Sequence, residues 1–148
     1  MPIPNLNERG LLPPGIYDCS LEEIGERFGT FQSTDRRSRL YERLQEYLTQ
    51  VRSANLAIAV IVNGSFVTSK ADPNDIDLIL VLPSSPDLRA DLAPMAYNVL
   101  SRRRVGRQYG FDILVAREDT IEYTQSVEFF QQVRGQPYLY KGVLRIGL

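Results

Sequence analysis

Three aspartates stand in or beside runs of residues that otherwise suit the inside of a protein. Asp77 interrupts the apolar run 76–82, Asp112 interrupts the run 111–115, and Asp75 stands two positions before Asp77. Because side chains alternate along a strand, Asp75 and Asp77 project to one side, roughly 6.5 Å apart. If the two runs form neighbouring strands, the carboxylate of Asp112 reaches the same place. The spacing therefore predicts a cluster of carboxylates drawn from two strands.

Carboxylates gathered in this way need something to offset their charge. Two of them repel by roughly 2.5 kcal/mol at an effective dielectric of ~20, and burial adds a desolvation cost. A cation, a shared proton or a neighbouring Arg or Lys would each relieve the repulsion. The sequence contains no histidine, and oxygen ligands without His or Cys favour Mg²⁺ or Mn²⁺. A divalent-metal site is the leading hypothesis, and the alternative is structural, since an aspartate such as Asp75 often opens a turn or a strand.

Composition narrows the classes of fold and function. The chain has 148 residues, 43% of them hydrophobic and 24% charged, with a net charge of −1. These values are typical of a single globular domain, here residues 1–148, and do not demand nucleic acid or an anionic membrane as partner. The absence of histidine excludes Ser-His-Asp and Cys-His catalysis, and the single Cys19 excludes an internal disulfide. Without a signal-peptide pattern or a run of ~20 apolar residues, we expect a cytoplasmic protein that does not engage a membrane.

Helical and strand patterns alternate along the chain. A capping box at Ser20 predicts a short helix ending near Gly29, and apolar residues at helical spacing predict a long helix from Asp35 to Arg52. Continuous apolar runs predict buried strands at 56–62, 76–82 and 111–115. Further predictions are an extended arm over 1–19, a helix from Ser85 or Pro94 to about Arg104, a helix capped by Asp119 and Glu122 reaching about Val133, and a strand or packing segment over 137–146. This order predicts an α/β domain with one small mixed sheet flanked by helices.

A second candidate feature follows the first buried strand. Gly64 lets backbone N–H groups approach an anion, and the hydroxyl of Ser65 adds another donor. Lys70, a few residues further on, could neutralise a phosphate group. The alternatives are a plain turn at Gly64-Ser65 and a solvated lysine at position 70.

Together these residues resemble the signature of the DNA polymerase β-like nucleotidyltransferase superfamily. That signature is a Gly-Ser pair after a strand, then Asp-x-Asp, then a third carboxylate on a later strand, and it is matched over residues 56–115. Three segments, 12–16, 64–70 and 141–146, also resemble a bacterial family of small, stand-alone nucleotidyltransferase-like proteins.

The resemblance implies roles for individual residues. Asp75 and Asp77 would bind two divalent ions that bridge a nucleoside triphosphate, and Asp112 would complete the metal site and help to deprotonate an acceptor hydroxyl. Gly64 and Ser65 would hold the β- and γ-phosphates. The implied reaction is displacement at the α-phosphorus with release of pyrophosphate, and the protein mainly positions charge. The acceptor could be a protein, an RNA or a small molecule.

Two other readings of the same residues remain open. A nucleotide- or partner-binding module could keep the fold without turnover, as in an antitoxin-type partner protein, or the aspartates could serve a plain structural α/β domain. Arg102, Arg103, Arg104 and Arg107 form a basic cluster near the end of a predicted helix, where solvated cations would complement its negative terminus. Contact with an RNA, a nucleotide or an acidic partner is the alternative for this cluster. The tyrosines near the C-terminus, Tyr138 and Tyr140, are expected to pack rather than to stack on bases.

Overall fold

A computed structural model describes residues 3–29, 35–70, 73–83, 99–133 and 135–148. Its principal helices are α1 (Leu21–Phe28), α2 (Arg36–Ala54), α4 (Arg102–Tyr109) and α5 (Ile121–Gln131), with a short 3₁₀ turn, η1 (Ser65–Val67). Its strands are β1 (Ile16–Cys19), β2 (Ala59–Asn63), β3 (Asp77–Leu82), β4 (Asp112–Arg117), β5 (Gln132–Val133), β6 (Gln136–Tyr140) and β7 (Val143–Gly147).

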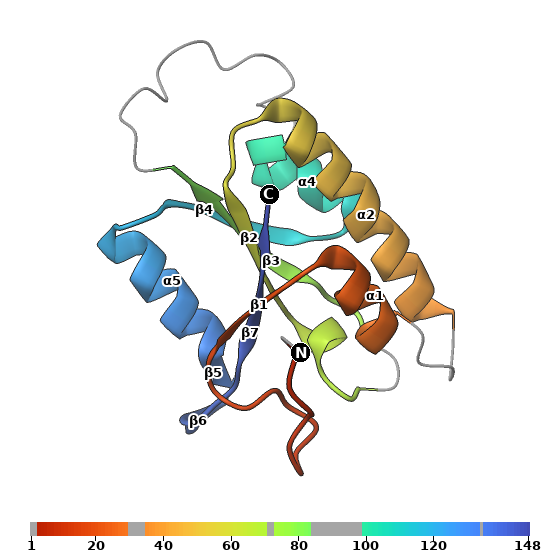
Figure 1. Cartoon of the computed structure of the whole chain (residues 1–148), viewed down its shortest axis with the longest axis vertical. Coiled ribbons are helices and arrows are strands. Elements are labelled where there is room, and N and C mark those ends of the chain that lie inside the picture. The colour runs from red at the N-terminus through yellow and green to blue at the C-terminus, as the bar shows by residue number, and fades with distance from the viewer. Residues whose placement is uncertain (1–2, 30–34, 71–72, 84–98, 134) are drawn as a thin grey trace.

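Five of the strands form one mixed sheet in the order β1-β7-β2-β3-β4. The pairs β1–β7 and β3–β4 are parallel, whereas β2 is antiparallel to both β7 and β3. Helices α1, α2 and α4 cover one face of this sheet and α5 covers the other (Figure 1). The predicted α/β class with a small mixed sheet is therefore confirmed.

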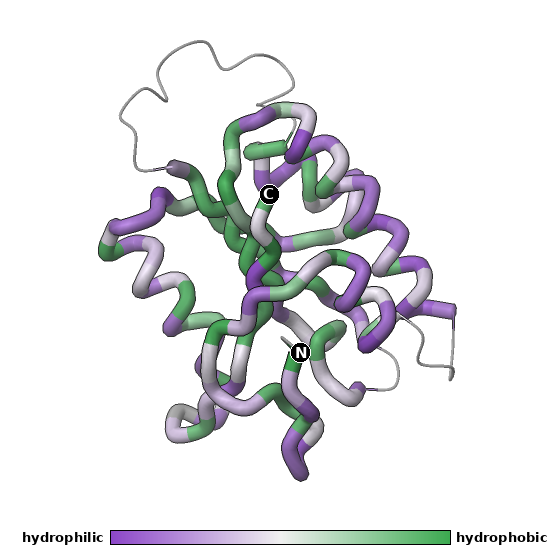
Figure 2. Tube along the Cα trace, in the orientation of Figure 1, coloured by the Kyte–Doolittle hydropathy of each residue, from purple (hydrophilic) through white to green (hydrophobic). Residues whose placement is uncertain are grey.

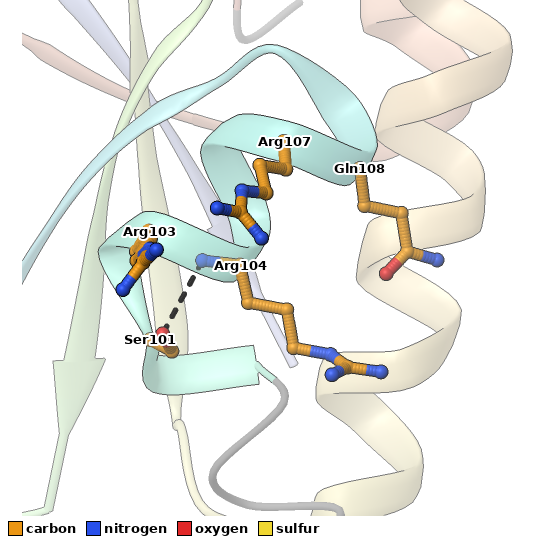
Figure 3. A pocket seen from close by; sticks show the side chains of 5 residues that line it. All are labelled: Ser101, Arg103, Arg104, Arg107 and Gln108. Atoms are coloured by element: carbon orange, nitrogen blue, oxygen red, sulfur yellow. Dashed lines mark hydrogen bonds between the residues drawn. The ribbon is translucent and has the colours of Figure 1, made fainter.

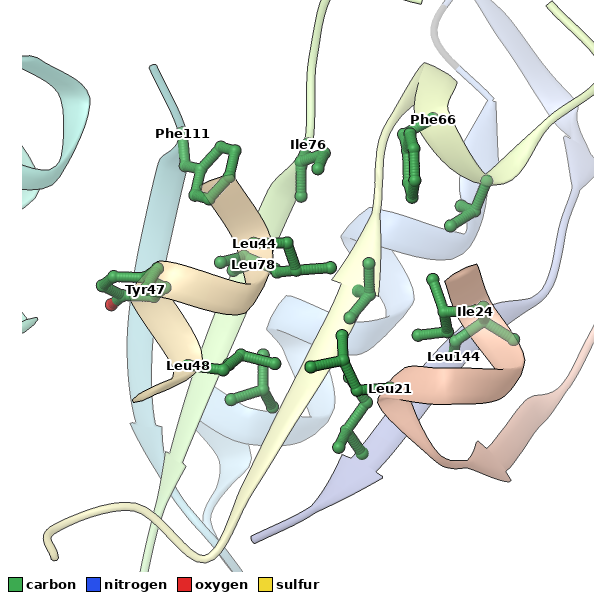
Figure 4. Close-up of a cluster of buried hydrophobic side chains, with 14 of the residues drawn as sticks. Leu21, Ile24, Leu44, Tyr47, Leu48, Phe66, Ile76, Leu78, Phe111 and Leu144 are labelled. Atoms are coloured by element: carbon green, nitrogen blue, oxygen red, sulfur yellow. The ribbon is translucent and has the colours of Figure 1, made fainter. Parts of the chain in front are cut away.

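The core has a larger and a smaller part, one on each face of the sheet. On the larger side, residues from α1 and α2 such as Ile24, Leu44 and Leu48 pack against Leu78 of β3 and Leu144 of β7 (Figure 4). On the smaller side, α5 packs against alternate residues of β2, β3 and β4. Strands buried on both faces lack polar alternation, which is why the central strands β2 and β3 are apolar along most of their length (Figure 2).

The first two helices follow the sequence predictions. In α1 the hydroxyl of Ser20 accepts the amide of Glu23 at 3.1 Å, and the Glu23 carboxylate accepts the amide of Ser20 at 3.0 Å. This reciprocal capping box fixes the start of the helix, which ends before Gly29 as expected. In α2 the predicted apolar stripe is buried along its length.

The arm predicted over residues 1–19 is part of the domain. Its last four residues form β1, an edge strand of the main sheet, and Leu12 is only 1% exposed. Two backbone bonds join this segment to the C-terminal strand, since the amide of Gly142 donates to Leu12 O and that of Val143 donates to Gly15 O. The prolines and glycines of this segment led to the prediction of an extended arm. Its few apolar residues nevertheless suffice to hold it against the sheet.

Other boundaries differ from the predictions for local reasons. Most of the helix predicted from residue 85 or 94 lies outside the described residues, and α4 begins at Arg102, close to where that helix was expected to end. Ser101 is not helical and forms the N-cap of α4, because its hydroxyl accepts the amide of Arg104 at 3.3 Å. The cap of α5 is Thr120 rather than Asp119, which has a left-handed backbone with φ of 60°.

The C-terminal segment forms two strands instead of one. Strand β6 pairs with β5 in a separate ribbon, and β7 enters the main sheet between β1 and β2. Tyr138 is 96% exposed and Tyr140 is 51% exposed, so the expectation that they pack is wrong for Tyr138.

Candidate functional site

A polar row crosses three adjacent strands at one edge of the sheet. Asp77 is the register partner of both Asn63 on β2 and Asp112 on β4. Directly opposed residues of neighbouring strands share a face, and the next residues on this face belong to the small core under α5. Asp77 and Asp112 therefore lie opposite each other on neighbouring strands, the condition on which the predicted cluster depended.

Asn63 was not anticipated from the sequence, where it served only to mark the end of a strand. Its side chain is 5% exposed, and Nδ2 donates to the carbonyl of Phe130 at 3.1 Å, at the end of α5. Its Oδ1 is buried and forms no hydrogen bond with the described residues. Because a buried carbonyl oxygen without a partner is costly, this is a place where a water or a cation would supply the missing partner.

The Gly64-Ser65 loop is joined to Asp75. The Ser65 hydroxyl donates to Asp75 Oδ1 in a short contact, and the Ser65 amide donates to the same oxygen at 3.1 Å. The amide of Phe66 donates to the carbonyl of Asp75 at 3.2 Å. The second carboxylate oxygen, Oδ2, forms no hydrogen bond with the part of the chain that the structure describes.

A buried arginine holds this loop against α2. The guanidinium of Arg37, which is 0% exposed, donates to the carbonyls of Phe28, Phe66, Thr68 and Lys70 at 3.1, 2.6, 2.7 and 2.6 Å. Burial lowers the pKa of this group below its usual value, yet an arginine keeps its charge in proteins. A signal for Arg37 exists in the sequence, because it continues the apolar stripe of α2 at the spacing of a buried position.

Aromatic packing fixes the start of β4. Phe111, directly before Asp112, stacks on Tyr109 with 5.9 Å between ring centroids and meets Tyr47 edge-on at 6.1 Å. The hydroxyl of Tyr47 donates to Val99 O at 2.6 Å. Burial raises the pKa of Tyr47, so this hydroxyl stays protonated as a donor. The backbone that carries Asp112 is thereby anchored to α2 and α4.

Two of the three predicted carboxylates, Asp77 and Asp112, are opposed in the sheet register, but the three do not form one cluster. No group of three or more Asp, Glu or Cys side chains within the described ranges is arranged to hold a metal ion. Asp75 is turned toward Ser65, and Asp112 is exposed and forms an ion pair with Arg102 at 3.4 Å. Such an exposed pair contributes about 0–1 kcal/mol and is easily exchanged for another partner. Lys70 is held at its carbonyl by Arg37, and its side chain is exposed.

Three of the four clustered arginines lie at the opposite end of a helix from the one expected. Arg102, Arg103 and Arg104 form the first turn of α4, which contains no acidic residue. The helix N-terminus carries positive partial charge, so each cation there is disfavoured by an amount comparable to ~0.3–1 kcal/mol. Arg107 lies one turn beyond Arg103, where like charges cost a further ~0.2–0.5 kcal/mol. The interpretation that these arginines complement a negative helix end is therefore wrong for Arg102, Arg103 and Arg104 and correct for Arg107, which lies in the last turn of α4.

These features define an α/β domain with a polar row and a glycine-serine loop at one edge of its sheet. The chain belongs to a family described as a family of unknown function, DUF6932, whose model matches residues 4–147. No curated protein and no solved structure matches the chain. Within the described residues, no helix has the length and apolar character needed to cross a membrane.

Proposed function

We propose that the protein is a divalent-metal-dependent nucleotidyltransferase with a minimal nucleotidyltransferase fold. It would transfer a nucleoside monophosphate from a nucleoside triphosphate to a hydroxyl of a protein, an RNA or a small molecule, with release of pyrophosphate. The observation that carries this proposal is the register pairing of Asp77 with Asp112 on parallel strands, beside the loop where Ser65 binds Asp75. Two like charges directly opposed on neighbouring strands are destabilising for a purely structural sheet.

The donor set suits a hard cation. Asp75, Asp77 and Asp112 would hold Mg²⁺ or Mn²⁺ through carboxylate oxygens, and the buried, unpartnered Oδ1 of Asn63 adds an oxygen in the same row. Ser65 orients Asp75 through one oxygen and leaves Oδ2 for a ligand, as outer hydrogen bonds do in metal sites. When bound, the divalent ions supply positive charge that stabilises the attacking and departing oxygens.

The proposed reaction is an in-line displacement. The acceptor oxygen forms a bond to the α-phosphorus while the bond from that phosphorus to the β-bridging oxygen breaks, and pyrophosphate leaves. Asp112 takes the proton of the acceptor hydroxyl, a role open to an exposed carboxylate. The backbone at Gly64, the hydroxyl of Ser65 and the ammonium of Lys70 would bind the β- and γ-phosphates.

Transfer assays with α-³²P-labelled ATP, GTP, CTP and UTP test this function. The protein is incubated with Mg²⁺ or Mn²⁺ and either itself, mixed RNA or small hydroxyl compounds as acceptor, and pyrophosphate release is measured in parallel. We expect transfer that falls by about 100-fold or more in Asp77→Asn and in Asp112→Asn, the scale of losing one charge-stabilising group. The matched control is Asp119→Asn, an exposed position beyond the other end of β4 whose left-handed backbone asparagine tolerates.

A binding module without turnover is the second candidate. It is favoured by the Arg102–Asp112 ion pair and by carboxylates that are not gathered. Titration calorimetry separates the two candidates. Metal-dependent nucleotide binding without transfer to any acceptor supports the module, whereas absence of both binding and transfer contradicts both and leaves a structural domain.

A further inference from the structure

A strongly basic surface lies on α4, next to the acidic row. The eight residues of α4 include four arginines and no acidic residue. Three of them, Arg103, Arg104 and Arg107, line a concavity of about 510 Å³ together with Ser101 and Gln108, and we call these five residues the arginine surface (Figure 3).

The arginine surface has no internal neutralisation. Within the described ranges, Arg103, Arg104 and Arg107 form no ion pair, and the fourth arginine, Arg102, is engaged by Asp112. Val105 and Tyr109 bury the other side of the helix, so the three guanidinium groups stand on its exposed side. Arg103 and Arg104 lie at the positive end of the helix, and Arg107 adds a like charge one turn beyond Arg103, so a bound anion would relieve both unfavourable terms.

The main donors of this surface are the guanidinium groups, because part of the first turn's backbone is already capped. The hydroxyl of Ser101 already accepts the amide of Arg104. Guanidinium groups bind phosphate oxygens in a two-pronged geometry and are weakly hydrated, which suits recognition of phosphate esters. The rest of the chain does not provide a general cationic field, since the net charge is −1. The attraction is therefore local to this surface.

We propose that the arginine surface binds the phosphate backbone of a single-stranded nucleic acid. A nucleic-acid strand carries one charge per nucleotide whatever its sequence, so three closely spaced arginines contact successive phosphates without base recognition. Arg102 links the surface to Asp112 at 3.4 Å, so a strand bound here runs beside the acidic row. If the proposed function holds, the acceptor is then a hydroxyl of this strand, and this last step alone rests on that function.

Fluorescence anisotropy with a labelled 12-nucleotide RNA of mixed sequence tests the binding, without nucleotide or divalent metal. For single strands, log K falls with log salt by about 0.7 for each phosphate contacted. Three contacts predict that wild-type affinity falls about 20-fold between 50 and 200 mM NaCl. The double variant Arg103→Gln/Arg107→Gln keeps one contact, so its affinity falls only about threefold over the same range.

The matched control is Arg9→Gln/Arg39→Gln, which removes the same charge from exposed positions outside α4. It should keep the wild-type salt dependence. Equal weakening by both double variants, or no binding by wild type at 50 mM NaCl, overturns the proposal. Displacement of the RNA by an oligo-glutamate peptide of equal charge would identify an acidic-protein surface. Displacement by a nucleoside triphosphate would identify a nucleotide subsite. Either result also overturns the proposal that this surface binds a nucleic-acid strand.

The two proposals fail separately. Asp77→Asn/Asp112→Asn should abolish nucleotidyl transfer and leave RNA binding intact. A wild-type protein that binds RNA through α4 but transfers a nucleotide only to another acceptor keeps both functions and excludes the strand as acceptor. Transfer by a wild-type protein that does not bind RNA keeps the proposed function and removes the arginine surface from it.

Discussion

Gly64 decides how closely the loop approaches the first residues of β3. Its φ is +100°, and a Cβ built there would lie 2.7 Å from the carbonyl oxygen of Asp75 and 3.1 Å from the amide of Asp77. Both atoms belong to the backbone and cannot move aside. We expect Gly64→Ala to lower the free energy of unfolding by at least about 2 kcal/mol, from backbone strain and the contact together. Urea denaturation measures the change.

Gly106 supplies the control for this prediction. It lies inside α4, where an added Cβ meets only the carbonyl of Phe111 at 3.8 Å, an ordinary contact. Gly106→Ala should therefore raise stability by roughly 0.5–1 kcal/mol through helix propensity. Equal effects of the two alanine substitutions would contradict the argument that close approach at Gly64 shapes the loop.

Individual residues of the candidate site differ in how far the sequence predicts them. Alternation predicts only which face Asp77 and Asp112 lie on within their own strands, whereas their direct opposition depends on the register of β3 and β4. The turn of Asp75 toward Ser65 depends on the loop conformation, which no periodicity encodes. Asn63 carries no signal of its own, because its importance comes from a partner 67 positions away, the carbonyl of Phe130.

At the scale of elements, one buried side chain joins α2, the end of α1 and the loop after β2. Arg37 satisfies four carbonyls of segments that have no strand or helix partner for them. Arg37→Gln leaves most of these buried acceptors without a donor. We expect it to lower stability by about 3 kcal/mol or more, and to raise the hydrogen-exchange rates of amides in η1 and the residues that follow.

Arg39 offers the matched control on the same helix. It forms an exposed pair with Asp35 at 2.7 Å, with 67% of its side chain accessible. Arg39→Gln should change stability by less than about 1 kcal/mol and leave exchange in η1 unaltered. If Arg37→Gln behaves in the same way, the loop is held by its own contacts with Asp75 and not by α2.

Element boundaries show which signals are local enough to read from a sequence. The capping box of α1 lies within four residues and was predicted correctly, as was the apolar stripe of α2. The position of α4 was not predicted correctly. Ser101 and Gly110 mark its two ends, but they can be recognised as caps only when the chain between them is known to be helical. The arginines obscured this helix, since its sole apolar residues facing the core are Val105 and Tyr109.

At the scale of the whole molecule, the two ends of the chain complete the sheet together. Strand β1 lies parallel to β7, and β7 lies between β1 and β2, so the N-terminal residues contact a strand more than 120 positions away in sequence. A sequence pattern that spans ten or twenty residues cannot predict pairing between strands so far apart. It explains why a Pro- and Gly-rich segment was interpreted as an arm although it belongs to the fold.

This pairing predicts that the N-terminal segment contributes to global stability. Leu12 is buried among the residues of the larger core, and its carbonyl accepts the amide of Gly142. Leu12→Ala should lower the free energy of unfolding by about 2–5 kcal/mol in a single cooperative transition. Ile121→Ala, at a position 71% exposed, should change it by less than about 0.5 kcal/mol. Comparable urea midpoints for the two variants would mean that the sheet folds without β1, and that the segment before it only rests on the surface.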